Sequence, residues 1–193
     1  MKKSLLSVLG ATVLAIATSG IANATIFVDN PIVTTIAAGS MWNYSINGDG
    51  AETVVNNQSY FTIYDFAGYI ASSAVAPSGW SVSVQNVGIT PSNQIVPDSS
   101  SLVNITWTFI GISGTPLPVG PIGGFIADST DPAAATTLGY YTYLAYNPSL
   151  SATDQGQGRA LTPSSSVPEP TSMALVGGGL ALVGIARLRR RKA

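Results

Sequence analysis

The chain of 193 residues contains no cysteine and no histidine. It therefore forms no disulfide of its own, and metal sites built from thiolate or imidazole ligands are excluded. Catalysis by a Ser-His pair, a Cys-His pair or a histidine general base is excluded for the same reason. Any enzyme mechanism that remains would depend on carboxylates, tyrosine, serine or arginine.

Charge is scarce as well, because charged residues make up only 9% of the chain, against about a quarter in typical globular domains. Between residues 25 and 166, Arg159 is the one basic residue and there are eight acidic ones, which gives this stretch a net charge of −7. The acidic residues are Asp29, Asp49, Glu52, Asp65, Asp98, Asp128, Asp131 and Asp154. An anionic surface repels the phosphates of nucleic acids, so we expect no nucleic-acid partner.

The N-terminus has the pattern of a secretory signal peptide. Lys2 and Lys3 precede a mostly apolar run of 13 residues, 5–17. Ala22 and Ala24 then supply the small residues that signal peptidase requires, which predicts cleavage after Ala24. The alternative is an uncleaved anchor helix, but the run is short for the roughly 20 residues that span a bilayer.

The C-terminus has the pattern of a single membrane span. The uncharged segment Thr171–Ala186 has 16 residues, about 24 Å as a helix. Snorkelling basic side chains make up the difference from a hydrocarbon core of about 30 Å. The flanking basic residues are Arg187, Arg189, Arg190, Arg191 and Lys192. This flank is expected to stay in the cytoplasm, so the acidic body lies outside, in agreement with the signal peptide.

A proline-rich segment, Val167-Pro168-Glu169-Pro170, directly precedes the predicted span. The two prolines favour an extended backbone and prevent the membrane helix from continuing outward. An extended segment next to serines is a form that a protease cleft can bind. The alternative is a plain tail anchor with a proline-rich neck.

Residues 167–193 together resemble the PEP-CTERM sorting signal, through the Pro-Glu-Pro motif, the glycine-rich apolar segment with Gly177–Gly179, and the terminal arginines. The resemblance implies recognition by an exosortase, a membrane-embedded cysteine protease or transpeptidase that cuts at or near the motif. It also implies a Gram-negative bacterium that makes exopolysaccharide and biofilm. The partners expected from this resemblance are an exosortase, the membrane and extracellular polysaccharide, in addition to signal peptidase.

The body between the two ends is predicted to be mainly β. No segment keeps an apolar 3.6-residue period, whereas short runs rich in Val, Ile, Thr, Tyr and Trp recur between Pro and Gly clusters. The alternation in 102–110 places Trp107 on an apolar face, and Trp80 begins a similar run, so both are expected in the core. The predicted strands are 41–46, 52–55, 60–67, 80–87, 102–110, 123–128 and 138–146, with Asn47–Gly50 as a hairpin turn.

This pattern favours an antiparallel β-sandwich. The predicted organisation is a signal peptide with its helix over 1–24, a sandwich over 25–160, a Ser/Pro-rich linker over 161–170, and a transmembrane helix with a basic tail over 171–193.

Three features of the body are candidate ligand sites. Asn47, Asp49 and Glu52 bring together oxygen atoms of the kind that Ca²⁺ binds, but their spacing is not that of an EF-hand, and an ordinary turn explains them. Asp128 and Asp131 form a second acidic pair, for which a loop cap is the simpler explanation. We therefore predict no metal and no cofactor.

The third feature is a tyrosine-rich run that could stack on sugar rings. Strand alternation would place Tyr141 and Tyr143 on one face and Tyr140 and Tyr146 on the other, so that some of these rings belong to the core.

Two classes of function are consistent with these observations. The favoured one is a non-catalytic protein of the cell surface or extracellular matrix, exported, inserted in the inner membrane by its C-terminal segment, and then processed by an exosortase. The alternative is a secreted carbohydrate-active enzyme or carbohydrate-binding module that uses carboxylates or surface tyrosines. No motif selects a catalytic carboxylate pair, so no catalytic residue is predicted.

The signal peptide leads to a direct prediction. The mature N-terminus should be Thr25, because Ala22 and Ala24 fit the small subsites of signal peptidase. N-terminal sequencing of the exported protein measures this, and a mature envelope form that still begins at Met1 would contradict it.

Overall fold

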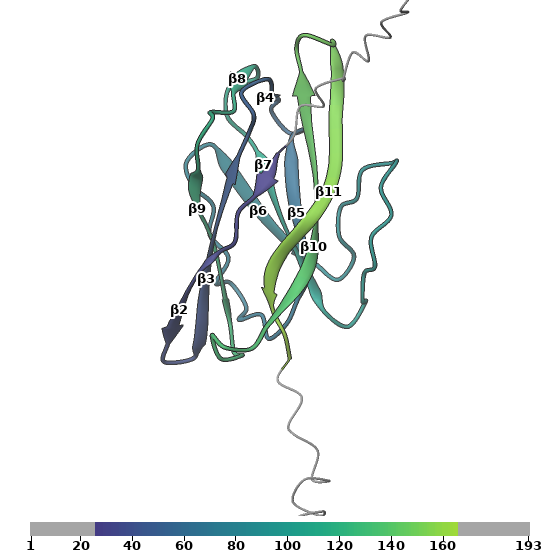
Figure 1. Cartoon of the computed structure of the whole chain (residues 1–193). Coiled ribbons are helices and arrows are strands. Elements are labelled where there is room, and N and C mark those ends of the chain that lie inside the picture. Colours follow the sequence, from purple (N-terminus) through teal and green to yellow (C-terminus); the bar gives the residue numbers. More distant parts are fainter. Residues whose placement is uncertain (1–25, 166–193) are drawn as a thin grey trace, which may run out of the picture.

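The computed structural model describes residues 26–165, which form two antiparallel β-sheets packed face to face (Figure 1). This confirms the prediction of a mainly β, antiparallel body. Within these residues no helix is long and apolar enough to cross a membrane. The predicted signal helix and the predicted transmembrane helix lie outside the described residues.

The smaller sheet, here called the β3 sheet, is built around β3 (Gly39–Asn47). One edge of β3 pairs with β9 (Ile122–Ser129), and the other pairs with β2 (Ile32–Ile36) and then β1 (Phe27–Val28). Every second residue of β3 is buried, which explains the alternating pattern of its sequence.

The larger sheet, the β10 sheet, contains five long strands in the order β6-β7-β5-β10-β11. Two short strands, β4 and β8, extend it beside the end of β10. The strands are β4 (Thr53–Val54), β5 (Tyr60–Phe66), β6 (Trp80–Gln85), β7 (Val103–Phe109), β8 (Thr115–Pro116), β10 (Thr136–Asn147) and β11 (Ala152–Pro163).

Aromatic rings from both sheets fill the space between them. Trp107 of β7 is fully buried and stacks on Phe61 of β5, with ring centroids 5.0 Å apart. Phe125 of β9 meets Phe61 edge-on at 4.9 Å and Trp80 edge-on at 5.2 Å. The prediction that Trp80 and Trp107 are core residues is confirmed.

The outer face of the β10 sheet is less exposed than its alternating sequence indicated. Thr106, on the polar side of β7, is only 3% exposed, and its hydroxyl lies 2.8 Å from that of Thr62 on β5. The long connection 86–102 accounts for this burial. The hydroxyls of Thr62 and Tyr64 donate hydrogen bonds to the carbonyl of Ile89 in this connection.

The turn predicted to close a hairpin at Asn47–Gly50 does not do so. β3 belongs to one sheet, and β4 pairs with β10 and β8 in the other, so these residues carry the chain across the sandwich. The side-chain amide of Asn47 donates to Asp29, and the backbone N–H of Gly48 donates to the carbonyl of Pro118. The prediction of a hairpin turn here was wrong, because the strand that follows finds its partners far away in the sequence.

The sequence analysis also missed β11, which pairs with β10 at twelve consecutive positions and extends three residues into the predicted linker. Glycines weakened its strand pattern. In the structure, Tyr143 and Tyr141 lie opposite Gly156 and Gly158, and a Cβ atom at Gly158 would come within 2.4 Å of the Tyr141 ring. The rings cover the glycine positions, so these residues fit this strand because they lack side chains.

The aromatic core gives a prediction about stability. Changing Trp107→Ala should lower the free energy of unfolding by about 3–5 kcal/mol, because a buried ring is lost and a cavity remains. Trp107→Phe should cost less, since it keeps a ring but loses the hydrogen bond from the indole N–H to the carbonyl of Val75. Chemical denaturation of both variants measures this, and an unchanged Trp107→Ala midpoint would place the ring outside the core.

Candidate functional site: the chain exit and the acidic turn

The described chain leaves the sandwich at the end of β11. Pro163 pairs with Thr136 at the start of β10, and the backbone N–H of Ser164 donates a 2.9 Å hydrogen bond to the carbonyl of Ala135. The exit is therefore fixed against the connection between β9 and β10. We call this end of the sandwich the exit end; it also contains the β2–β3 turn at its rim (Figure 1).

The residues predicted to carry sorting and cleavage lie outside the described part of the chain. They are the motif residues Val167, Pro168, Glu169 and Pro170, the basic residues Arg187, Arg189, Arg190, Arg191 and Lys192, and the cleavage-site residues Ala22 and Ala24. The structure adds to these predictions the point at which the last strand, β11, ends, which is Pro163, four residues before Val167 of the predicted motif.

The acidic turn between β3 and β4 was the first candidate for a calcium site. Asn47 and Asp49 serve the fold instead. The side-chain amide of Asn47 donates hydrogen bonds to the carboxylate of Asp29, and the carboxylate of Asp49 accepts one from the backbone N–H of Ala51. The contact between Asp49 and Ala51 is an Asx-type turn.

Glu52 is the unusual member of this turn. Its side chain is only 1% exposed, and neither carboxyl oxygen has a hydrogen-bond partner among the described residues. Burial first, and then interactions with the carboxyl groups of Asp49 and Asp154, raise the pKa of Glu52 to about 7. Burial also raises the pKa of Asp154, a change that the Tyr143 hydroxyl partly offsets. Near neutral pH, this buried group changes between a neutral acid and an unpaired anion.

The Glu52 side chain is 1% exposed, so its carboxyl group lies beneath the surface of the body. Across residues 26–165, no three acidic side chains converge closely enough to hold a metal ion. The residues from Asn47 to Glu52 carry the chain from one sheet to the other, and the buried carboxyl group of Glu52 lies in this crossing.

The second acidic pair is connected to the fold through its backbone. Asp128 lies on β9 opposite Met41 of β3, and its backbone N–H donates a hydrogen bond to the Ser73 hydroxyl. The backbone carbonyl of Asp131 accepts a 2.7 Å hydrogen bond from the Ser40 hydroxyl, which itself accepts from the indole of Trp42. This chain of hydrogen bonds connects the exit end to the core through the Asp131 backbone. One carboxylate oxygen of Asp128 is buried without a hydrogen-bond partner among the described residues, so the loop cap stays a prediction.

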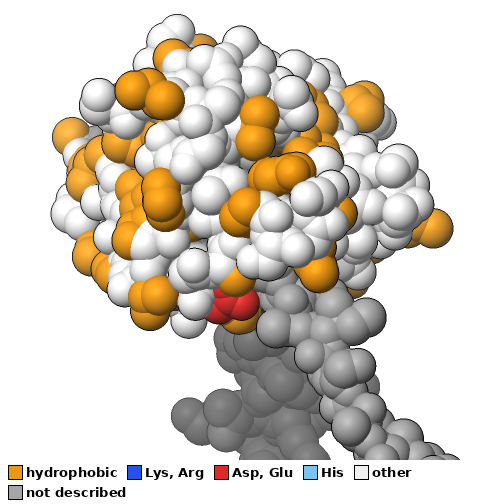
Figure 2. All heavy atoms as spheres, turned by 90° about the horizontal axis from the view of Figure 1, so that it is seen from above, with side chains coloured by type: hydrophobic (Ala, Val, Ile, Leu, Met, Phe, Trp, Pro, Cys, Tyr) orange, Lys and Arg blue, Asp and Glu red, His pale blue; other side chains and the backbone are white. Residues whose placement is uncertain are grey.

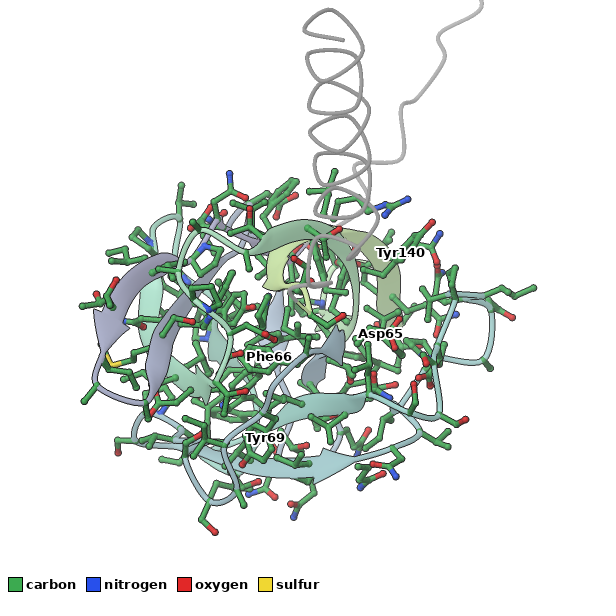
Figure 3. The ribbon with its side chains drawn as sticks, turned by 90° about the horizontal axis from the view of Figure 1, so that it is seen from below. Asp65, Phe66, Tyr69 and Tyr140 are labelled. Carbon is green, nitrogen blue, oxygen red and sulfur yellow. The ribbon has the colours of Figure 1, made fainter. Side chains whose placement is uncertain are left out.

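The tyrosines of β10 divide between the two faces as predicted. Tyr141 and Tyr143 are buried in the core, at 6% and 4% exposure. Tyr140 lies at the periphery of the molecule, whereas Phe66 lies between the sheets (Figure 3). The guanidinium of Arg159 stacks 3.5 Å above the Tyr140 ring and donates a hydrogen bond to its hydroxyl. One face of Tyr140 is therefore already occupied.

Residues 166–192 match the family model of the PEP-CTERM protein-sorting motif. The chain carries a PEP-CTERM sorting motif. This confirms the resemblance seen in the sequence, and the motif indicates an exported protein that is held in a membrane and then sorted through an exosortase. No curated protein matches the chain.

The burial of Glu52 predicts that the stability of the fold depends on pH. The folded pKa of about 7 lies above the usual value of 4.5, so the folded state keeps a proton that the unfolded state loses between these values. Stability should therefore fall as pH rises from about 4.5 to 7. Glu52→Gln keeps the size of the side chain and removes its charge. It should raise the free energy of unfolding by about 1–3 kcal/mol at pH 8 and change it little at pH 4.5.

Urea denaturation of the two proteins at both pH values measures this difference. Stability curves that run parallel from pH 4.5 to 8 would show that Glu52 keeps an ordinary pKa.

Proposed function

We propose that this protein is a non-catalytic component of the cell surface or extracellular matrix, associated with exopolysaccharide or biofilm. Its tail would deliver the β-sandwich through the inner membrane to an exosortase, and processing would leave the sandwich at the surface or release it. The match of residues 166–192 to the sorting motif carries this proposal.

The use of the carboxylates supports a non-catalytic role. Asp65 accepts a hydrogen bond from the backbone N–H of Ser99, and Asp98 accepts from Gly88 and from the side chain of Asn104. Together they fasten the long connection 86–102 to the sheet. With Asp29 and Asp49 occupied in turns and Glu52 buried, few carboxylates remain for the open pair that glycoside hydrolysis requires.

The surface composition supports association with a neutral polymer. The end opposite the exit shows hydrophobic side chains scattered among other uncharged side chains and backbone, with a single acidic patch and no basic side chain in view (Figure 2). Exposed hydroxyl and amide groups can exchange hydrogen bonds with neutral sugars, whereas the net charge of −7 disfavours anionic polymers.

The alternative, a carbohydrate-binding module or carbohydrate-active enzyme that uses surface tyrosines, has less support. The buried rings of Tyr141 and Tyr143 are unavailable, and Arg159 covers one face of Tyr140. Tyr146 lies six residues further along the strand, about 20 Å away at 3.3 Å per residue. That separation is too large for the two rings to act as one platform.

The sorting motif gives the test. Changing Glu169→Ala leaves the apolar segment and its basic flank intact, so membrane insertion should persist while processing falls. Gel mobility and membrane fractionation should be followed in a host with an exosortase and in one without. Replacing the five basic residues with neutral ones is the contrasting variant, because it removes the positive-inside signal and should reduce anchoring itself.

Wild-type protein with the same mobility in both hosts would mean that the tail is only an anchor. Purified body that releases sugars from a polysaccharide panel would replace the non-catalytic role with the enzymatic one.

A further inference from the structure

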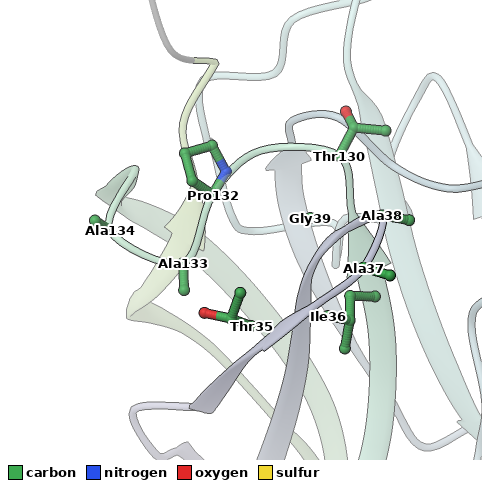
Figure 4. A pocket seen from close by; sticks show the side chains of 9 residues that line it. All are labelled: Thr35, Ile36, Ala37, Ala38, Gly39, Thr130, Pro132, Ala133 and Ala134. Atoms are coloured by element: carbon green, nitrogen blue, oxygen red, sulfur yellow. The ribbon is translucent and has the colours of Figure 1, made fainter.

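The exit end contains an uncharged groove beside the point where the chain leaves the body. One wall is the β2–β3 turn and the other is the connection between β9 and β10 (Figure 4). The groove has a volume of about 640 Å³ and is open to solvent. Its lining residues are Thr35, Ile36, Ala37, Ala38, Gly39, Thr130, Pro132, Ala133 and Ala134.

The groove and the exit share one connection. Pro132, Ala133 and Ala134 form the groove wall, and the carbonyl of the next residue, Ala135, holds the backbone of Ser164 at 2.9 Å. Asp131, the acidic residue of this connection, does not line the groove, and its carboxylate lies close to Gly68. The surface next to the exit therefore carries mainly small, uncharged side chains, although the body as a whole has a net charge of −7.

The remaining chain sets how far the body can lie from the sorting motif. Three backbone steps separate Ser165 from Pro168, which allow at most about 10 Å, close to the diameter of one α-helix. Six steps separate Ser165 from Thr171, the first residue of the predicted span, and allow about 20 Å. An enzyme that holds Pro168-Glu169-Pro170 in a cleft therefore has room for little more than one helix between the motif and the body.

We infer that the groove is a second contact for the exosortase, formed by the folded body and used together with the motif. This inference rests on the proposed sorting function. The partner is the part of the enzyme that faces outward from the membrane, next to the cleft that binds the motif. Small, uncharged side chains line the walls, so an apolar or polar loop of the enzyme can approach closely.

The test changes the groove without changing the motif. Ala134 is exposed, so Ala134→Arg should leave the melting temperature of the protein unchanged while it places a long cation in the groove. Val119→Arg, at a residue 79% exposed near the opposite end, is the matched control. In the host with an exosortase, Ala134→Arg should slow processing roughly five- to tenfold, the effect of losing about 1 kcal/mol of contact, and Val119→Arg should not.

A second variant distinguishes docking from simple obstruction. Insertion of ten Gly/Ser residues between Ser165 and Ser166 separates the body from the motif. If the groove docks on the enzyme, the insertion should slow processing by a similar factor, and Ala134→Arg should then have little additional effect. Faster processing after insertion would overturn the inference, because it would mean that the body only obstructs the enzyme.

The two proposals fail in different ways. Wild-type protein that is not processed refutes the sorting function itself, whereas normal processing of Ala134→Arg refutes only the docking groove. In the host without an exosortase, Ala134→Arg should fractionate with the membrane as the wild type does. A change there would show that the groove contacts lipid, and would also overturn the inference.

Discussion

The pairing of β10 with β11 is the interaction on which the arrangement of this chain depends. Twelve consecutive residue pairs join the two strands, and Tyr141 and Tyr143 lie across from Gly158 and Gly156. One face of β10 supplies core residues, and the last residue of β11 sets where the chain leaves the fold. A single strand pair thus connects the hydrophobic core to the position of the sorting tail.

Much of the fold could be predicted from the sequence because the signal is local. The strand predicted over 102–110 spans Val103–Phe109, and alternation placed Trp107 in the core. The wrong predictions depend on contacts between residues far apart in the sequence. The glycines of β11 weaken its strand pattern, and only the tyrosine rings of the neighbouring strand β10 fill the space above them. Asn47–Gly50 connects two sheets and does not close a hairpin. The sorting motif is likewise contiguous and could be read directly. The groove could not, because its walls come from segments about ninety residues apart.

The carboxylates of the body show how an anionic, charge-poor surface is compatible with a stable fold. Asp29, Asp65 and Asp98 each accept hydrogen bonds that hold a turn or the long connection in place. A hydrogen bond to a charged acceptor contributes more than one to a neutral acceptor. Glu52 differs because its oxygens are buried without partners, so it weakens the fold when it ionises. Asp29, Asp65 and Asp98 can therefore be explained by the segments whose position they fix.

The two ends of the described chain lie at opposite ends of the sandwich. Phe27 pairs with Asn47 beside the carbonyl of Pro118, whereas Pro163 pairs with Thr136 at the exit end. The far end exposes Ile112 and Val119, and the exit end is joined to the predicted span by at most about 20 Å of chain. The predicted signal peptide and the predicted sorting tail therefore attach to different ends of the body, so the folded sandwich separates the two predicted processing sites.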